Sequence, residues 1–366
     1  MEYDVTIKKT LQTILNINLI DMVWSQATLP VSNGGLGIRL ATDLALPAFL
    51  SSLAGCVDLS LQLLPSRLHS VGGTQDTFYI SAGIEWQSRC GMAVPDAASI
   101  GAQKAWDSPQ VLKKFDEVFA AAQTQSGRAR IIAAAAPHSG DFLNVLPCSA
   151  VGTRLDDTSL RIAVALRLGA VICAPHTCVC GEQVDSSGIH GLACRKSAGR
   201  HMRHNAVNDL IKRALASAEI PSLLEPSSLS RDDGKRPDGL TVMPWTNGRC
   251  LIWDFTCPDT LAASHINRAV TGPGLVADDA EQRKTLKYRS LSPHYHFTPI
   301  AVETLGAIGQ EALTFFLDLG RRIATITAEP RSLQFLLQRL SVAIQRGNAA
   351  CVLGTVQSSN GWDELF

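Results

Sequence analysis

Residues 236–257 read RPDGLTVMPWTNGRCLIWDFTC and carry the strongest strand pattern in the chain. Leu240 and Val242 alternate with polar positions, as in a half-buried strand. Asn247-Gly248 favours a two-residue type I′ turn, and Cys250–Cys257 continues as the return strand. The stretch therefore predicts a β-hairpin, and the rest of the domain is interpreted around it.

Two aspartates, Asp238 and Asp254, lie on the two predicted strands of this hairpin. A carboxylate within an apolar strand needs a partner, because burying a lone charge is costly. Carboxylate oxygens are ligands that Mg²⁺ prefers, so the pair predicts a catalytic magnesium site. A bound magnesium ion would polarise a scissile phosphate and lower the pKa of an attacking water. The alternative is a structural role, with salt bridges from the two aspartates to Arg236 and Arg249.

The register of the hairpin decides whether the two aspartates meet. With a two-residue turn at Asn247-Gly248, Asp254 faces Thr241, three residues beyond Asp238. Pro244 cannot donate to the ladder, so a bulge or a wider loop near it could realign the strands. The sequence leaves both registers open.

A lysine near the carboxylates would stabilise developing negative charge or orient the water. The position two residues after Asp254 is Thr256, so the lysine must come from elsewhere. Lys284 and Lys287 are three residues apart on a predicted helix at 276–289 and share one face of it. Either lysine can be the catalytic one, and both remain candidates.

The segment before the hairpin contains a pattern typical of a metal site. Cys178, Cys180, His190 and Cys194 have the spacing C-x-C-x9-H-x3-C, and thiolates with an imidazole suit a tetrahedral structural zinc ion. Cys173 and His176 are close enough in sequence to be substitute ligands. The alternative is a set of metal-free cysteines that pack as small apolar groups.

A basic helix follows the metal pattern. Its cationic residues and a histidine form a surface that could neutralise phosphates, and the alternative is an ordinary solvated helix face. Arg203 is distinct, because it falls within the apolar stripe of the helix and needs a carboxylate or phosphate partner there. It is therefore a further catalytic candidate, unless the helix begins only after Asn205. The predicted nucleic-acid-binding residues are Arg195, Lys196, Arg200, His204, Lys212 and Arg213.

The bulk properties set the protein class. The chain has 366 residues, of which 46% are hydrophobic and 18% charged, so we expect sizeable folded cores rather than disorder. Its 33 basic and 33 acidic residues balance, so any preference for an anionic partner must be local. The N-terminus lacks a signal-peptide pattern, no stretch is apolar enough for a membrane span, and the cysteines have metal spacing. A nuclear or cytoplasmic protein is expected.

The remaining segments read mainly as helices. Helices are expected at 5–25, 40–64, 98–123, 157–168, 303–325 and 331–346, with Pro109 near a helix N-terminus and Pro137 as a breaker. The predicted fold class is α+β: a mostly helical N-terminal region, a small zinc knuckle, and an α/β core with a mixed sheet flanked by helices. The predicted regions are 1–168 (helical accessory region), 169–198 (zinc knuckle), 199–328 (catalytic domain) and 329–366 (C-terminal helix and tail).

These motifs, taken in order, resemble the C-terminal part of non-LTR retrotransposon polyproteins, in which a CCHC zinc knuckle precedes a restriction-like endonuclease of the PD-(D/E)xK type. The resemblance covers roughly residues 175–325, and the segment 29–39 is similar to the helical region after the reverse-transcriptase palm. Asp254-x-Thr256 departs from the usual Glu-x-Lys. The pieces that carry the resemblance are the four metal-site residues, Arg203-His204-Asn205, Lys235-Arg236-Pro237-Asp238, Asp254-Phe255-Thr256 and Lys284…Lys287-Tyr288.

The resemblance implies a restriction-endonuclease-like core and Mg²⁺-dependent nicking of one DNA strand, with DNA and the element's own RNA as partners. The Tyr/Phe-x-Asp-Asp motif of a polymerase site is missing from the sequence, so polymerase activity is not expected. The alternatives are a catalytically inactive zinc-knuckle module that binds nucleic acid, and a retroelement fragment without a stable role.

Overall fold

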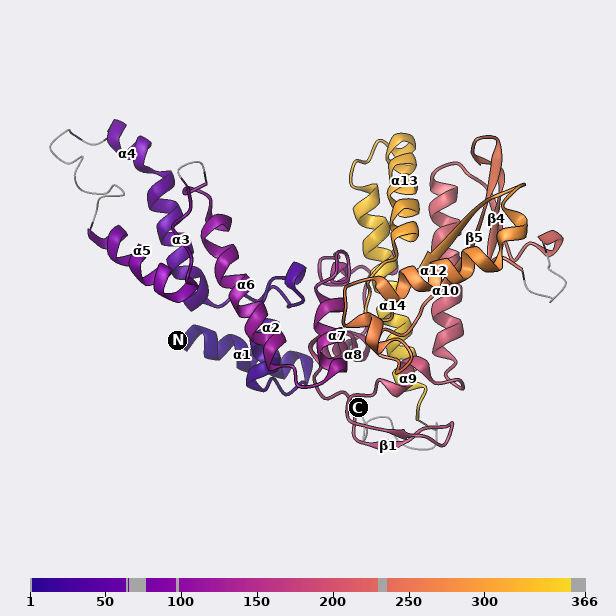
Figure 1. The fold of residues 1–366 in the computed structure, drawn as a ribbon, viewed down its shortest axis with the longest axis horizontal. Coiled ribbons are helices and arrows are strands. Elements are labelled where there is room, and N and C mark those ends of the chain that lie inside the picture. Colours follow the sequence, from indigo (N-terminus) through magenta and orange to yellow (C-terminus); the bar gives the residue numbers. More distant parts are fainter. Residues whose placement is uncertain (1, 64, 66–76, 97–98, 230–235, 357–366) are drawn as a thin grey trace. The chain divides into compact units, whose positions relative to one another are not determined.

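The computed structural model describes residues 2–63, 65, 77–96, 99–229 and 236–356. Figure 1 shows more helix than strand, with a small sheet in the C-terminal half of the chain. The helices are α1 (Glu2–Leu15), α2 (Asp21–Ala27), α3 (Ala41–Gly55), α4 (Val57–Leu63), α5 (Thr77–Cys90), α6 (Gln103–Ala121), α7 (Gln125–Ala134), α8 (Asp157–Leu168), α9 (His190–Ala193), α10 (Gly199–Ser217), α11 (Ile266–Ala269), α12 (Leu275–Lys287), α13 (Gln310–Thr327) and α14 (Ser332–Leu353). The strands are β1 (His176–Thr177), β2 (Gln183–Val184), β3 (Ser222–Leu224), β4 (Gly239–Thr246), β5 (Arg249–Thr256) and β6 (His296–Ala301).

The chain divides into two compact units. Unit 1 comprises residues 1–14 and 19–122, and unit 2 comprises 15–18 and 123–366. Helices α7 and α8, which the sequence groups with the N-terminal accessory region, therefore belong to unit 2. Among the helices that the structure describes, none combines the length and apolar character needed to cross a membrane.

Unit 1 has a small aromatic core. Trp86 of α5 and Trp106 of α6 are fully buried, with ring centroids 4.9 Å apart, edge to face. The Trp86 indole donates to the carbonyl of Trp106 and the Trp106 indole to that of Ile100. Because Trp106 fixes the first turn of α6, the helix begins at Gln103 and Pro109 lies inside it, so the predicted N-terminal position of Pro109 is wrong.

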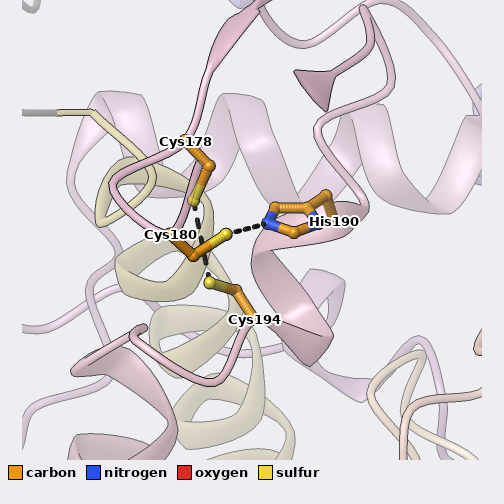
Figure 2. Close-up of side chains that lie close together, drawn as sticks. All are labelled: Cys178, Cys180, His190 and Cys194. Carbon is orange, nitrogen blue, oxygen red and sulfur yellow. Dashed lines mark hydrogen bonds between the residues drawn. The ribbon is translucent and has the colours of Figure 1, made fainter. Parts of the chain in front are cut away.

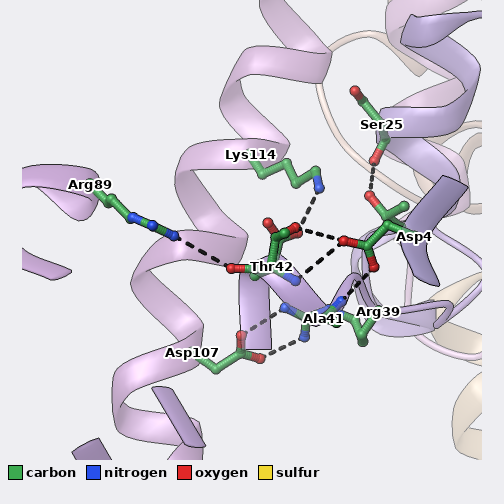
Figure 3. A network of polar contacts seen from close by, with 10 residues as sticks. Asp4, Ser25, Arg39, Ala41, Thr42, Arg89, Asp107 and Lys114 are labelled. Carbon is green, nitrogen blue, oxygen red and sulfur yellow. Dashed lines mark hydrogen bonds and ion pairs between the residues drawn. The ribbon is translucent and has the colours of Figure 1, made fainter. Parts of the chain in front are cut away.

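Polar contacts hold the N-terminal end of α3 within unit 1 (Figure 3). The Asp4 carboxylate accepts hydrogen bonds from the backbone N–H groups of Ala41 and Thr42, the first two residues of the helix. Arg39 and Asp107 form a two-pronged ion pair at 2.6 and 2.7 Å. Since both partners are largely shielded from water, this pair fixes the approach of α3 to α6 more firmly than an exposed pair would.

Within the described residues, unit 2 contains a four-stranded mixed sheet ordered β3-β4-β5-β6. The β3–β4 and β4–β5 pairs are antiparallel, whereas β6 runs parallel to β5. Both central turn residues, Asn247 and Gly248, have positive φ, as a type I′ turn requires. The predicted hairpin is confirmed, while β6 was not foreseen from the sequence.

Helices cover both faces of this sheet. Helices α10, α13 and α14 pack on one face, where Trp253 and Phe255 of β5 enter an extended core cluster. Helix α12 lies against β6 on the other face, where Ala277 and Ala280 contact Ala301. The coarse prediction of a mixed sheet flanked by helices is therefore confirmed, and α12 comes to the face that carries Asp254.

Helix α14 is the central support of unit 2. It contacts α8, α9, α10 and α13, and most of its length is buried. The sequence analysis predicted that residues 329–366 form a separate C-terminal region. The described part of this region instead belongs to the hydrophobic core of unit 2. The predicted helix at 303–325 begins only at Gln310, because residues up to Gly309 form a turn in which Gly306 has a φ of 94°. Helices α5 and α7 were not foreseen.

Candidate functional site

The four predicted metal ligands come together in unit 2. Cys178 and Cys180 lie on the β1–β2 hairpin, His190 begins α9, and Cys194 directly follows α9. One potential ligand atom from each of the four lies within 4.8 Å of every other. Figure 2 shows the side chains converging on one point.

The spacing fits a tetrahedral ion. The sulfur atoms of Cys178 and Cys194 are 3.7 Å apart, and the Cys180 sulfur is 3.3 Å from Nε2 of His190. Zinc–sulfur bonds of about 2.3 Å in a tetrahedron put two sulfur atoms roughly 3.8 Å apart. The cluster could therefore hold a metal such as zinc, and its donor atoms match zinc's preference for sulfur and nitrogen ligands.

The two thiols of the hairpin have different acidities. Burial raises the pKa of Cys178 to about 12. A backbone hydrogen bond from Glu182 lowers the pKa of Cys180 to about 7. Because zinc binds thiolates, metal uptake must expel the Cys178 proton, so the affinity of the cluster for zinc will rise with pH.

The end of α14 supports the metal hairpin. The backbone N–H of Val179 donates to the carbonyl of Thr355, and the ring of His176 is 2.8 Å from the Thr355 hydroxyl. Cys173 contacts the carbonyl of Asp185 instead of the cluster. The two proposed substitute ligands, Cys173 and His176, are thus outside the metal cluster.

The second cluster contains the two predicted carboxylates. A regular ladder from the Thr246–Arg249 pair would place Gly239 opposite residue 256, but Gly239 pairs with Trp253. Two irregularities in β4, on either side of Pro244, account for this shift of three residues. The same register puts Asp238 opposite Asp254, and the N–H of Asp238 donates to the Trp253 carbonyl. The bulged alternative is therefore the observed one.

At the irregular stretch of β4, the Thr241 side chain forms hydrogen bonds in place of the regular backbone bonds between β4 and β5. The N–H of Leu251 donates to the hydroxyl of Thr241, which in turn donates to the Met243 carbonyl. Thr241 is fully buried, so these bonds lie in a dry environment. These two bonds satisfy the Leu251 N–H and the Met243 carbonyl beside Pro244, which has no N–H to donate, and so they support the shifted register.

Asp254 is held by the face of α12. Lys284 forms an ion pair with Oδ2 of Asp254, and the hydroxyl of Tyr288 is 3.0 Å from Oδ1. Lys287 instead donates to the Tyr288 hydroxyl at 2.8 Å. Of the two candidate lysines, Lys284 is thus the one that touches the carboxylate.

Asp238 is held from α10 and β5. Its Oδ2 accepts the N–H of Phe255 at 2.6 Å and lies 3.1 Å from Nε2 of His204. The Trp253 indole donates to the amide oxygen of Asn208, so the amide nitrogen of Asn208 faces Nδ1 of His204. In neutral His204 this arrangement makes Nδ1 the acceptor and leaves Nε2–H to donate to Asp238.

The two carboxyl groups have opposite pKa shifts. Burial, with added repulsion from Asp238, raises the pKa of Asp254 despite its lysine partner. Burial acts on the pKa of Asp238 in the same direction, but the contact with His204 and the Phe255 N–H outweigh it, so the pKa is lowered. The hydrogen bond to Asp238 raises the pKa of His204. Neither aspartate bonds to Arg236 or Arg249: Arg236 pairs with Glu225, and Arg249 donates to the Ser292 carbonyl.

Two adjoining clefts lie beside the carboxylate cluster: His204 lines one and Lys284 lines the other, whereas Asp238 and Asp254 are not among their lining residues. A cleft of about 480 Å³ is lined by α10 and the end of β5, and a second of about 310 Å³ extends to α12. Arg200, Thr256 and Cys257 line both, so the clefts are continuous there. The basic and imidazole side chains along them are Arg195, Arg200, His201, Arg203, His204, His265, Arg283 and Lys284.

Arg203 is buried within α10, so the alternative in which the helix begins after Asn205 is wrong. Its guanidinium donates to the amide oxygen of Asn348 on α14 at 2.6 Å. From the sequence, a carboxylate or phosphate partner was expected for the Arg203 guanidinium. Its partner is instead the neutral amide of Asn348. Arg203 also lines the larger cleft, and its catalytic role stays a prediction.

Only some of the other predicted nucleic-acid-binding residues line the two clefts. Arg195, Arg200 and His204 line the clefts. Lys196 donates to the Val179 carbonyl and so braces the metal hairpin. Lys212 and Arg213 line neither cleft, and Arg213 pairs with Asp209 on its own helix. The predicted motif residue Lys235 lies outside the described residues.

Two side chains of the carboxylate cluster had no role assigned from the sequence, although Tyr288 belongs to the motif Lys284…Lys287-Tyr288. Asn208 orients His204, and Tyr288 contacts Asp254. Asn208 follows His204 by four positions on α10, and Tyr288, the residue directly after α12, follows Lys284 by four. That i, i+4 spacing is the signal that could have found them.

No protein-family model matches the chain, and no curated protein is significantly similar to it.

Proposed function

We propose that unit 2 is a Mg²⁺-dependent DNA endonuclease that nicks one strand, derived from the C-terminal part of a non-LTR retrotransposon polyprotein. The observation that carries the proposal is the bulged register of β4, which brings Asp238 opposite Asp254 beside Lys284. Bulges occur often next to active sites, where they re-aim side chains, and this one supports the proposal in the same way.

The two aspartates suit a divalent cation. Both are largely buried, and the charge of Asp238 contributes to the raised pKa of Asp254, so a bound cation would relieve their repulsion. Magnesium, held by Asp238 and Asp254, supplies Lewis-acid polarisation of the phosphate and a more acidic water. The mixed sheet between α10 and α12 is the arrangement expected of a restriction-like core.

The chain's own groups have distinct roles in the proposed reaction. Arg195 and Arg200 bind backbone phosphates and draw the nucleic acid along the clefts. Lys284 faces the carboxylates and offers an ammonium group to the negative charge that develops on the phosphate. His204 fixes the orientation of Asp238. Cys194, the last of the four potential metal ligands, directly precedes Arg195, so the metal cluster anchors the cationic end of the larger cleft.

A nicking assay on supercoiled DNA with Mg²⁺ tests the proposal. We expect Asp238→Asn and Asp254→Asn each to lower the nicking rate by on the order of 1,000-fold, because each removes one charged ligand. Asp209→Asn is the matched control: it changes an exposed aspartate of α10 that pairs with Arg213, and the rate should stay at the wild-type level. Unchanged nicking in both cluster variants would refute the proposal.

One observation favours a second candidate, a nucleic-acid-binding module without catalysis. Asp254 is already paired with Lys284 and Asp238 with His204, so the cluster is partly neutralised without a metal ion. Salt-dependent DNA binding, with no cleavage in either Mg²⁺ or Mn²⁺, would select this function. Arg200→Ala should then weaken binding and reduce the salt slope by about one.

A further inference from the structure

We propose that Tyr288 is the positioning residue that fixes the Asp254 carboxylate relative to the backbone beside Asp238, so that both can bind a divalent cation. The inference rests on the proposed function. Tyr288 follows α12 directly, and its side chain is fully buried against Phe297, with ring centroids 5.0 Å apart. The ring is therefore fixed by packing, and the hydroxyl is presented to the cluster in one place.

The hydroxyl of Tyr288 joins the backbone around Asp238 to the side chain of Asp254. It is 2.9 Å from the carbonyl of Arg236, in the turn that leads into Asp238, and 3.0 Å from Oδ1 of Asp254. Its single proton is shared between these two acceptors. One group thus restrains both halves of the candidate cation site, which come from different strands.

Lys287 strengthens this restraint. Its ammonium donates to the Tyr288 oxygen at 2.8 Å, which polarises the hydroxyl towards its acceptors. Lys284 neutralises the other oxygen of Asp254. The two lysines of α12 therefore have different roles: Lys284 acts on the carboxylate, and Lys287 acts through the tyrosine.

Tyr288→Phe removes the hydroxyl and leaves the buried ring in place. Outer partners of metal ligands typically contribute 10- to 100-fold to affinity, so we expect the Kd for Mn²⁺ to rise by about 10-fold or more. Binding is measured on the full chain with its zinc cluster loaded, from the loss of the free-Mn²⁺ electron paramagnetic resonance signal. The half-saturating Mn²⁺ concentration for nicking should rise in parallel. Lys287→Met should raise the Kd by a smaller factor.

The control is Tyr79→Phe in unit 1. It also removes a buried tyrosine hydroxyl, one without a hydrogen-bond partner among the described residues, and the Kd should not change. An unchanged Kd in Tyr288→Phe overturns the inference while leaving the endonuclease proposal intact. If the wild-type chain and Asp254→Asn bind Mn²⁺ equally weakly, the magnesium site itself is wrong and the inference falls with it.

Discussion

The Cys/His cluster and the carboxylate cluster of unit 2 are built in opposite ways. The four potential ligands of the Cys/His cluster lie within residues 178–194, on one hairpin and at the two ends of one short helix. The carboxylate cluster draws on residues from 204 to 288, carried by α10, the hairpin of β4 and β5, and the segment that includes α12. A local cluster can be recognised from spacing, whereas a dispersed one depends on how helices and strands meet.

The largest expected effect comes from breaking the local cluster. Cys194→Ser removes a buried ligand, so we expect the zinc content of the purified chain to fall to background and Tm to fall by roughly 10 °C or more. Zinc analysis and thermal unfolding measure these effects.

Cys173→Ser is the control, because Cys173 is also buried but lies outside the cluster. Its zinc content should match wild type. If Cys194→Ser retains its zinc, the assignment of the four ligands is wrong.

The next largest expected effect concerns stability and comes from disturbing the packing of α14 against α10 at Gly347. Ala in place of Gly normally stabilises a helix interior by about 1 kcal/mol. At Gly347 the added Cβ would lie 2.4 Å from Cβ of Arg203, so Gly347→Ala should instead destabilise unit 2 by about 1–3 kcal/mol. Urea unfolding gives the change in free energy.

Gly83→Ala is the matched helix-interior control. A Cβ there meets no atom within 4 Å, so this variant should be neutral or slightly stabilising. A stabilised Gly347→Ala would show that α10 and α14 are less tightly packed than the structure indicates.

The smallest expected effect is on the pH dependence of the free energy of unfolding. It comes from Glu281, a buried carboxyl group outside the Asp238–Asp254 pair. Glu281 of α12 accepts the N–H groups of Glu311 and Ala312 at the start of α13. Burial raises its pKa from 4.5 to about 7, and the charge of Asp278 adds to the rise. Because the folded state binds the proton more tightly, this contribution to stability is fully present below pH 4.5 and is lost as pH rises through 7.

Urea unfolding between pH 5 and 8 should therefore show a falling free energy of unfolding, with a shallower slope in Glu281→Gln. Glu311→Gln changes an exposed neighbour and should keep the wild-type slope. Equal slopes for wild type and Glu281→Gln would mean that the carboxyl is already ionised in the folded protein at pH 5.

By itself, the sequence determined the β-hairpin and the local Cys/His site. Alternating apolar residues and Asn247-Gly248 predicted the hairpin, and the Cys/His spacing predicted the cluster, because both are properties of neighbouring residues. It also identified Asp238, Asp254 and two lysines as candidates, because charged groups among apolar residues require partners.

Only the tertiary structure decided which of these groups meet. The register of β4 depends on the Thr241 hydroxyl, which accepts the Leu251 N–H at the irregular stretch beside Pro244, and a shift of one residue would turn every side chain to the other face. The choice of Lys284 over Lys287 follows from the packing of α12 on the sheet. The Asn348 partner of Arg203 lies 145 residues away in sequence. Such contacts arise from the close packing of distant segments, which no local pattern encodes.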